Sequence, residues 1–430
     1  MVKRDDKYSW HVGSCPPPID PHSLVKHQIV RSYLERYIQV LMSNVLIEKL
    51  TLSVVDGFAG GGDYSGENAG EFHDGSPLIA MKTVAEQQAA LNVGRQKPRF
   101  VDAKYYFVEK KRCNFAYLSK LVGATVEPSR IGRDIELLQG TFQERVGPII
   151  NDIRKRAGGE RAIFLLDQYA YDQVPAPLLK TIFSNVKGAE VLLTFNVDSL
   201  VTFLSNTEQS RKKLEEIGLA RYIDWESLDR LKAAGGNVWR SAIQRNLAKG
   251  LVEISGAKHY TIFYITPMGS TSWTYWLVHL SNSFKARDVM MELHWENANH
   301  FSHYLEPDIF TLGYSTNADR AATGQEAIDL GEAHHFDAIA NQRCLDGLTA
   351  KLVPTIYGLD KPTRFGDVLQ QIGSSTPGTA DMIRQSLDAA IRNGDIAAAG
   401  AAGGGKRTRG STLRLDDVLT AGKQRPIFFL

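Results

Sequence analysis

The sequence predicts a doubly wound α/β fold, a mostly parallel sheet with helices on both faces, joined to a smaller C-terminal domain. Between residues 50 and 198, five apolar segments typical of strands alternate with segments of helical periodicity. Because each crossover between consecutive strands is a helix, the strands are expected to run parallel. From about residue 335 the pattern changes to short helices and a glycine-rich basic hairpin.

The composition is typical of a soluble globular protein. The chain has 430 residues, 43% hydrophobic and 23% charged, with a formal net charge of +2. This length exceeds what one core usually organises, so two or three domains are expected. Cys15, Cys113 and Cys344 are too scattered for a disulfide framework, which favours a reducing, cytoplasmic location. No signal peptide and no apolar run of roughly 18 residues is present, so no membrane association is expected.

An N-terminal arm and helix, residues 1–45, precede the predicted sheet. The arm is rich in proline, and helical spacing of apolar residues begins after Ser23. Ser76 and Pro77 are a strong helix start, because serine caps a helix N-terminus and proline fits the first turn. The expected strands are 50–58, 99–110, 135–142, 162–171 and 189–198, and the intervening helices are 75–91, 111–124, 143–157 and 175–186.

A helical insertion is expected to interrupt the sheet domain. The first part of the core spans residues 46–205, and the charged segment 206–256 is the predicted insertion. Residues 257–334 are expected to complete the core and form a linker, with a late strand at 259–267 and a helical segment at 270–293.

The C-terminal segment, residues 335–430, predicts a winged helix domain. Its order of helix, turn, helix and hairpin is typical of that fold. The helices are expected at 335–353, 364–372 and 374–395, and two short strands at 396–400 and 412–415 flank the hairpin "AAGGGKRTRGS".

This domain is the basic part of the chain. Residues 351–430 contain 11 Lys and Arg against 7 Asp and Glu, a net charge of +4. The candidates for contact with nucleic-acid phosphates are Lys406, Arg407 and Arg409 in the hairpin and Arg384 and Arg392 in the preceding helix. The segment lacks aromatic side chains for stacking on bases, so docking of a protein is the alternative.

The stretch "VVDGFAGGG", residues 54–62, ends the first strand in a loop that could hold a small molecule. Gly60, Gly61 and Gly62 allow close approach of a ligand, because no Cβ intervenes and positive φ is unstrained. Ligands of doubly wound sheets bind beyond the carboxyl ends of the strands, where this loop is expected. It is neither the GxGxxG of dinucleotide-binding folds nor a P-loop, and a simple tight turn is the alternative.

Glu109, at the end of the second strand, could accept hydrogen bonds from both hydroxyls of a ribose, as the acidic residue of dinucleotide-binding folds does. It follows Asp56 by 53 residues, more than the roughly 20 of a compact unit, and an insertion explains the excess. The alternative is an ordinary exposed glutamate.

Asp167, Gln168 and Tyr169 follow the fourth strand. A carboxylate and an amide at this point could orient a nucleophilic nitrogen or oxygen, and Tyr169 could stack on a planar substrate. The alternative is that Asp167 only caps the next helix.

No metal site is predicted. Glu296, His300 and His303 fall within reach of one helical face, but no further ligand is evident nearby. A solvated or hydrogen-bonded histidine face is the simpler interpretation.

In this order, the motifs resemble class I S-adenosylmethionine-dependent methyltransferases. More narrowly, the chain resembles the three-Cys-motif partner family (TcmP). The matching segments are "VKHQIVRSYLERYIQVL", "VVDGFAGGGDYSG", "DGSPLIA", "FVEK", "FLLDQYAY", "YTIFYITPMG" and the terminal winged helix, which together span most of the chain. Members usually carry Asp-Pro and an aromatic residue where this chain has Asp167, Gln168 and Tyr169.

The resemblance implies a Rossmann-like methyltransferase sheet of seven strands with S-adenosylmethionine as cofactor. It implies that the methionine end is held by Asp56 and by the loop of Phe58, Ala59, Gly60, Gly61 and Gly62. Glu109 would bind the ribose, and Gly140 and Thr141, after the third strand, would lie near the adenine.

We expect methyl transfer to RNA or DNA, with Asp167, Gln168 and Tyr169 as the catalytic group that holds the acceptor at near-attack distance. One alternative is a weakly active or inactive cofactor-binding module that docks nucleic acid or a radical-SAM-type partner enzyme; the departure at Gln168 favours it. Another is methylation of a peptide or a metabolite.

Overall fold

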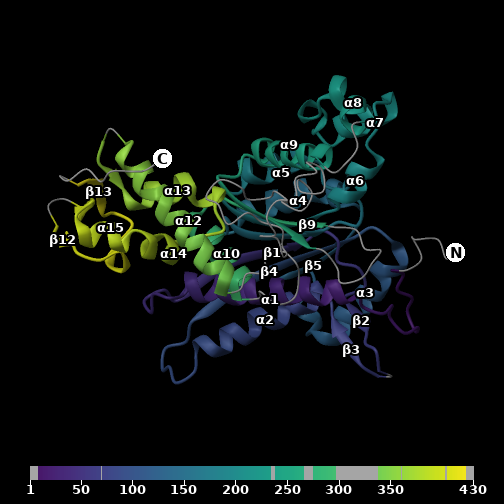
Figure 1. The fold of residues 1–430 in the computed structure, drawn as a ribbon. Coiled ribbons are helices and arrows are strands. Elements are labelled where there is room, and N and C mark those ends of the chain that lie inside the picture. The colour runs from purple at the N-terminus through teal and green to yellow at the C-terminus, as the bar shows by residue number, and fades with distance from the viewer. Residues whose placement is uncertain are drawn as a thin grey trace. The chain divides into compact units, whose positions relative to one another are not determined.

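The computed structural model describes residues 8–68, 70–233, 238–265, 275–296, 338–359, 361–401 and 404–422 (Figure 1). The chain forms two compact units. The first comprises Met1–Asp229, Lys249–Ala257 and Pro267–Asn282, and the second comprises Arg230–Ala248, Lys258–Thr266 and Ser283–Leu430.

The elements of the sheet region alternate as expected. In chain order they are α1 (Pro21–Leu41), β1 (Lys49–Asp56), β2 (Asp63–Ser65), β3 (Phe72–Asp74), α2 (Ser76–Leu91), β4 (Phe100–Glu109), α3 (Arg112–Thr125), β5 (Ile135–Gln139), α4 (Phe142–Lys155), β6 (Arg161–Asp167), α5 (Ala176–Asn185), β7 (Gly188–Phe195) and α6 (Val197–Phe203). All five predicted strands and the helices between them are confirmed.

The central sheet has seven strands in the order β5-β4-β1-β6-β7-β9-β8, where β8 is His259–Ile265 and β9 is Tyr275–Ser281. The first five strands of that order pair in parallel, and β9 is antiparallel to β7. Strand β1 is buried from Leu50 to Asp56, as expected for a parallel strand covered on both faces. Helices α1, α2 and α3 lie on one face of the sheet, and α4 and α5 lie on the other (Figure 1).

The strand order reverses between β1 and β6. From β1 the chain proceeds outward to β4 and β5, then returns to β6 on the other side of β1 and continues to β7. Helices that leave β1 and β6 therefore depart in opposite directions, and a crevice forms beyond the carboxyl ends of these strands. The loop after Asp56 lies at this crevice, as the sequence predicted.

One predicted helix is wrong in part. Residues 270–293 were expected to be helical, but among the described residues from 275 onward Tyr275–Ser281 is strand β9, and Phe284–Glu296 is helix α10. Trp276, Leu277, Val278 and Leu280 of β9 are buried. A short, mostly apolar run has no periodicity that separates a buried strand from a buried helix.

The predicted insertion is helical. It contains α7 (Glu208–Glu216), α8 (Trp225–Ala233) and α9 (Val238–Ser255). In the described part of the chain, no helix combines the length and the apolar composition that crossing a bilayer requires.

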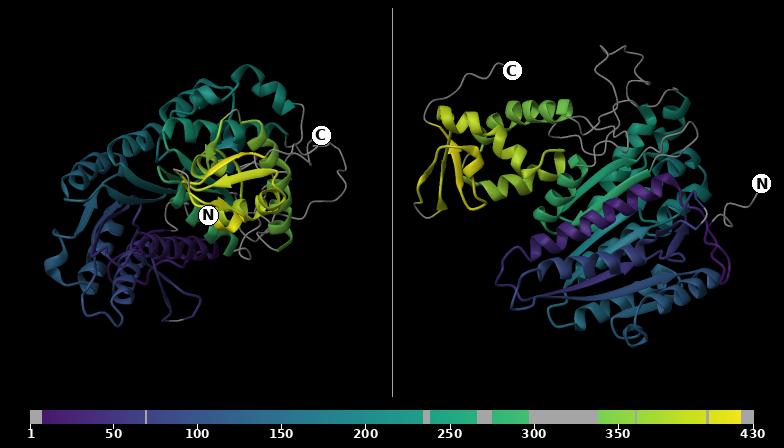
Figure 2. Two further views of the ribbon diagram at one scale, coloured as in Figure 1. Left: turned by 90° about the vertical axis from the view of Figure 1, so that its left-hand side faces the viewer. Right: turned by 90° about the horizontal axis from the view of Figure 1, so that it is seen from below.

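The C-terminal part of the second unit combines helices with a small antiparallel sheet. Its elements are α12 (Ala338–Tyr357), β10 (Thr363–Arg364), α13 (Phe365–Ile372), α14 (Ala380–Ser386), α15 (Asp388–Asn393), β11 (Ile396–Ala399), β12 (Lys406–Arg407) and β13 (Val418–Ala421). The sheet order is β10-β13-β11-β12. The left view of Figure 2 shows these yellow strands beside helices of the same unit. One apolar cluster, which includes Leu348, Phe365, Ile383 and Leu419, fills the space between them.

Two details of this region differ from the sequence prediction. The segment 412–415 is not a strand, and the strand that pairs with β11 is β13, Val418–Ala421. The single helix expected over 374–395 is two short helices, because the chain turns at Leu387 between α14 and α15.

Candidate active site

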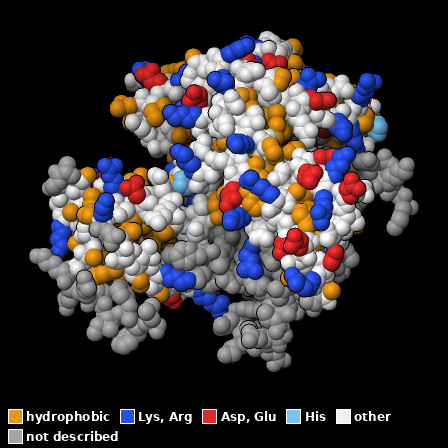
Figure 3. Space-filling model, turned by 90° about the horizontal axis from the view of Figure 1, so that it is seen from above, with side chains coloured by type: hydrophobic (Ala, Val, Ile, Leu, Met, Phe, Trp, Pro, Cys, Tyr) orange, Lys and Arg blue, Asp and Glu red, His pale blue; other side chains and the backbone are white. Residues whose placement is uncertain are grey.

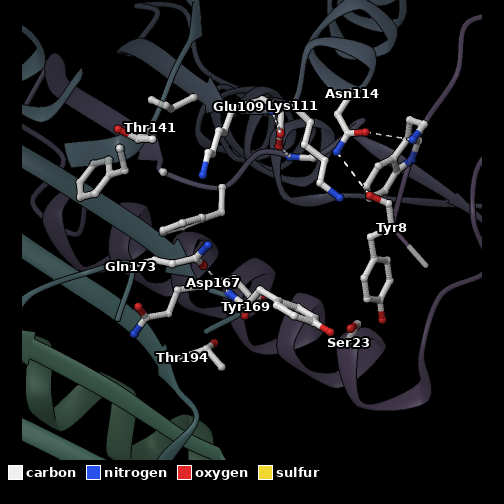
Figure 4. Close-up of a pocket in the computed structure, with 18 of the residues that line it drawn as sticks. Tyr8, Ser23, Glu109, Lys111, Asn114, Thr141, Asp167, Tyr169, Gln173 and Thr194 are labelled. Atoms are coloured by element: carbon white, nitrogen blue, oxygen red, sulfur yellow. Dashed lines mark hydrogen bonds between the residues drawn. The ribbon is translucent and has the colours of Figure 1, made fainter. Parts of the chain in front are cut away.

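A cavity of about 660 Å³ lies at the carboxyl ends of the parallel strands, within the first unit. Its walls come from the arm before α1, from α1 itself, from the glycine loop, and from the segments that follow β4, β5 and β6. In Figure 4, Glu109 and Thr141 lie on one side, Asp167, Tyr169 and Thr194 on the other, and Tyr8 and Ser23 at one end. A volume of this size is typical of pockets for small molecules and cofactors.

Asp56 holds the glycine loop from behind and does not line the cavity. Its carboxylate is buried and accepts the Phe58 N–H at 3.0 Å and the Ser76 hydroxyl at 2.5 Å. Burial raises the pKa of Asp56 to about 7. The loop is fixed further because Gly57 N–H donates to Leu165 O and Ala59 N–H donates to Val108 O.

The N-terminal arm covers the same loop. The Trp10 indole N–H donates to Asp63 O at 2.7 Å, and its backbone N–H donates to Asn114 Oδ1 at 3.0 Å. A Cβ on Gly61 would lie 2.2 Å from the Trp10 ring, and Gly60 has a φ of +59°. The glycines are therefore required by close packing and by backbone conformation.

The loop residues divide into two groups. Phe58 and Gly60 line the cavity, whereas Ala59, Gly61 and Gly62 do not, because they pack against the strands, Trp10 and α3.

Glu109 lies in the cavity wall with its carboxylate fixed by the backbone. Its Oε2 accepts the Gly60 N–H at 3.0 Å, and its Oε1 accepts the Lys111 N–H at 2.6 Å. Burial raises the pKa of Glu109 above its ordinary value. The Lys110 backbone also hydrogen-bonds to this carboxylate. A carboxylate has about four lone-pair sites, so Glu109 retains acceptor capacity for a ligand in the cavity.

Gly140 and Thr141 line the cavity beside Glu109. Gly140 N–H donates to Glu109 O at 3.0 Å, and Gly140 has a φ of +141°. Thr141 is the N-cap of α4 and forms a capping box with Glu144.

Asp167 forms an ion pair with Lys26, a residue of α1 that the sequence did not single out. Lys26 Nζ lies 2.7 and 2.6 Å from the two carboxylate oxygens, and the Thr194 side chain also hydrogen-bonds to Asp167. Burial acts to raise the pKa of Asp167, but the Lys26 ammonium outweighs this effect, and the pKa lies below its ordinary value. Asp167 therefore presents a carboxylate to the cavity at neutral pH.

The two residues after Asp167 also line the cavity. Gln168 is buried, and its Oε1 accepts the Val174 N–H at 2.9 Å. Tyr169 is exposed, and its backbone N–H donates to Gln173 Oε1 at 3.0 Å. The structure thus brings all three predicted catalytic residues to one wall.

Several lining residues come from segments that carried no recognisable motif. Tyr8 donates a hydrogen bond to Asp20, and both line the cavity with Ser23. Such residues carry no sequence signal, because only the folded arm and α1 bring them to the sheet.

The five predicted nucleic-acid contacts differ in their surroundings. Arg384 forms an ion pair with Asp381, and Arg392 with Asp388. Arg407 forms a bidentate ion pair with the buried Asp417, at 2.8 and 3.0 Å. Lys406 and Arg409 are exposed. On the face of the molecule in Figure 3, Lys and Arg side chains are interspersed with Asp and Glu.

Among the described residues, no group of three or more His, Cys, Asp or Glu side chains could hold a metal ion. His300 and His303 lie outside the described residues.

No protein-family model matches the sequence, and no curated protein matches it. Solved structures that match the chain include the Legionella pneumophila protein LPL1258, at 11% identity over 64% of this chain and 91% of that chain, with a TM-score of 0.36. Trm1 from Pyrococcus horikoshii, in complex with S-adenosyl-L-methionine, is 11% identical over 94% of this chain and 91% of that chain, with a TM-score of 0.33. The O-methyltransferase TomG from Streptomyces achromogenes, in complex with SAM, is 12% identical over 62% of this chain and 91% of that chain, with a TM-score of 0.27. At these scores the likenesses do not identify the function of this chain.

Proposed function

We propose that this chain is an S-adenosylmethionine-dependent methyltransferase that acts on RNA or DNA. The observation that carries the proposal is the position of Glu109, whose two carboxylate oxygens are fixed by the Gly60 and Lys111 N–H groups in the wall of the cavity. Charged acceptors held in this way suit the two neighbouring hydroxyls of a ribose.

The other walls fit the rest of the cofactor. Phe58 and Gly60 offer an apolar side chain and bare backbone for the methionine end, and Gly140 and Thr141 lie where the adenine would bind. Asp56, Ala59, Gly61 and Gly62 would support this loop from behind. When bound, S-adenosylmethionine supplies a methyl group on a positively charged sulfur.

Asp167 and its neighbours would hold the methyl acceptor. Its low pKa makes Asp167 a weak base, so its main contribution would be to accept a hydrogen bond and orient the nucleophile. Gln168 and Tyr169 would complete this wall.

The C-terminal region would add contacts to nucleic acid. Its elements follow a winged helix order, with β11 and β12 around the basic hairpin. Lys406 and Arg409 are the side chains best placed for phosphate contact, because Arg384, Arg392 and Arg407 already form ion pairs within this region. The narrower proposal, membership of the three-Cys-motif partner family with a radical-SAM-type partner enzyme, rests on the sequence resemblance alone.

The direct test is transfer of labelled methyl groups from the cofactor to total cellular RNA, DNA and protein. Wild type should label a nucleic-acid pool, and Asp167→Ala should bind cofactor normally yet lose roughly 100-fold or more in rate, as expected when a positioning group is removed. Glu127→Ala, an exposed substitution outside the cavity, is the control. If wild type binds cofactor but labels no pool, the chain is a cofactor-binding docking module; labelling of protein alone would favour a peptide substrate.

A further inference from the structure

Exposed apolar side chains gather at the amino ends of β1 and β4, at the end of the sheet opposite the cavity. They belong to two segments, 43–49 between α1 and β1 and 92–100 between α2 and β4. Single exposed apolar residues are normal on protein surfaces. Here, however, five of the thirteen large apolar side chains that are exposed in the described part of the chain lie in these two segments. We call them the amino-end patch: Val45, Leu46, Ile47, Val93 and Phe100, which are 38% to 82% exposed.

The two segments that carry the amino-end patch are in contact. The Phe100 N–H donates to Glu48 O at 2.8 Å, and Phe100 pairs with Lys49 in the sheet. Arg95 Nη2 lies 3.5 Å from Val45 O. Every residue of the patch is within two positions of one of these contacts, so the five side chains form one continuous surface.

Arg99 holds the first segment in a fixed shape. This arginine is only 4% exposed, and its guanidinium donates to Ile47 O, Met42 O and Asn44 O at 2.8, 2.6 and 2.9 Å. Asn92 fixes Arg99 in turn, because it accepts the Arg99 N–H at 2.7 Å and donates to Arg99 O at 2.8 Å. A surface that is ordered before binding loses little entropy when a partner docks on it.

Lysine and arginine side chains surround the amino-end patch. The two segments contain four Lys and Arg against one Glu, a net charge of +3. Lys49 forms an ion pair with Asp102, and Lys97 forms one with Glu48. Arg95 is exposed and forms no ion pair with any residue that the structure describes. Its guanidinium can therefore bind a carboxylate of another molecule beside the apolar side chains.

We propose that the amino-end patch is a docking surface for a partner protein, which contributes an amphipathic segment with apolar side chains flanked by carboxylates. The apolar side chains of the partner cover the patch, and a carboxylate pairs with Arg95. Apolar and aromatic side chains beside an arginine are typical of the centres of protein interfaces. Strand β1 separates the patch from the cavity by roughly 23 Å, so the partner leaves the cavity open. The proposal is independent of what the cavity binds.

Two other occupants fit this surface less well. A second copy of this chain would bring the same net charge of +3 against itself, because a two-fold interface joins identical surfaces. An anionic bilayer would attract the cations but repel the carboxylates of Glu48 and Asp102, which are 60% and 44% exposed. A protein segment can place its own carboxylates beside Arg95 and away from these two acids.

The test is a fluorescence anisotropy titration of the full-length protein against a labelled helical peptide that carries leucine on one face and glutamate on both flanks. Wild type should bind this peptide, and the double variant Leu46→Asp, Val93→Asp should bind it about 10-fold or more weakly. Arg95→Glu should also lose about 10-fold or more and should prefer a matched peptide with lysine in place of glutamate. Phe203→Asp is the control, because Phe203 is 66% exposed on α6, after the carboxyl end of β7, and it should bind as wild type does.

Three results would overturn the proposal. The first is peptide binding that is absent in wild type or unchanged in both patch variants. The second is binding to phosphatidylserine vesicles, or a dimer in analytical ultracentrifugation, that wild type shows and the double variant loses, because the occupant would then be a bilayer or a second copy. The third is a lower unfolding midpoint in the double variant, which would mean that Leu46 and Val93 pack within the chain.

Discussion

Lys26 and Asp167 form an ion pair with N–O distances of 2.7 and 2.6 Å, although 141 residues separate them in the chain. The pair joins α1 to the end of β6 at the point where the strand order of the sheet reverses. The first helix of the chain is thus part of the candidate active site.

Lys26→Met should raise the pKa of Asp167, because it removes the positive charge and the hydrogen bond that favour the ionised carboxylate. The protonated carboxyl cannot accept a hydrogen bond from the substrate in the same way, so the acidic limb of the methyl-transfer rate should move to higher pH. Initial rates at saturating cofactor across the pH range measure this shift. Lys120→Met, an exposed substitution on α3, should leave the profile unchanged; a profile that stays in place in Lys26→Met would remove Lys26 from the site.

In Gly61→Ala the new Cβ would lie 2.2 Å from the Trp10 ring, so the arm or the loop must move. We expect this variant to lose about 10-fold or more in cofactor affinity and about 1–3 kcal/mol in stability. The matched control is Gly123→Ala in α3, where a Cβ meets nothing within 4 Å and helix propensity predicts a gain of about 1 kcal/mol. Calorimetry with S-adenosylhomocysteine and thermal unfolding measure both effects. Equal behaviour of the two variants would mean that the packing of Trp10 does not shape the loop.

In the basic hairpin, we expect different residues to contribute to DNA binding and to stability. Replacing Lys406 and Arg409 with alanine should weaken binding to duplex DNA. The slope of the logarithm of the binding constant against the logarithm of the salt concentration should become shallower by about 0.9 for each phosphate that the protein no longer neutralises. Arg407→Ala should instead lower the stability of the C-terminal region, because it leaves the buried Asp417 without its ion-pair partner. DNA titrations at several salt concentrations measure the first effect, and thermal unfolding measures the second. An unchanged salt dependence in the Lys406 and Arg409 double variant would indicate that the hairpin binds a protein and not DNA.

The sequence predicted the parts of the fold that local pattern determines. The strands that end in Asp56, Glu109 and Asp167 are largely apolar segments with polar ends, and the glycine loop is recognisable by composition alone. Their order along the chain was enough to predict that these ends meet at one edge of a parallel sheet.

The missing parts depend on contacts between distant segments. No local pattern marked Lys26 or Trp10 as a site residue, and each acquires its role from partners on β6 or on the glycine loop. Strand β9 was predicted as a helix because a short, mostly apolar segment fits either structure. Which of Lys406, Arg407 and Arg409 is free for a ligand could not be predicted either, because Asp417 selects Arg407 only in the folded structure.

The most direct test of the central claim is calorimetric titration of the wild-type protein, Glu109→Ala and Glu127→Gln with S-adenosylhomocysteine. Wild type and the exposed control Glu127→Gln should bind equally, and Glu109→Ala should lose about 1.5–3 kcal/mol for each hydroxyl bond to the carboxylate, or roughly 10- to 100-fold in affinity per bond. Adenosine alone should show the same dependence on Glu109, because the ribose is the part it contacts. No binding by wild type, or equal binding by Glu109→Ala, would contradict the assignment of this cavity to S-adenosylmethionine.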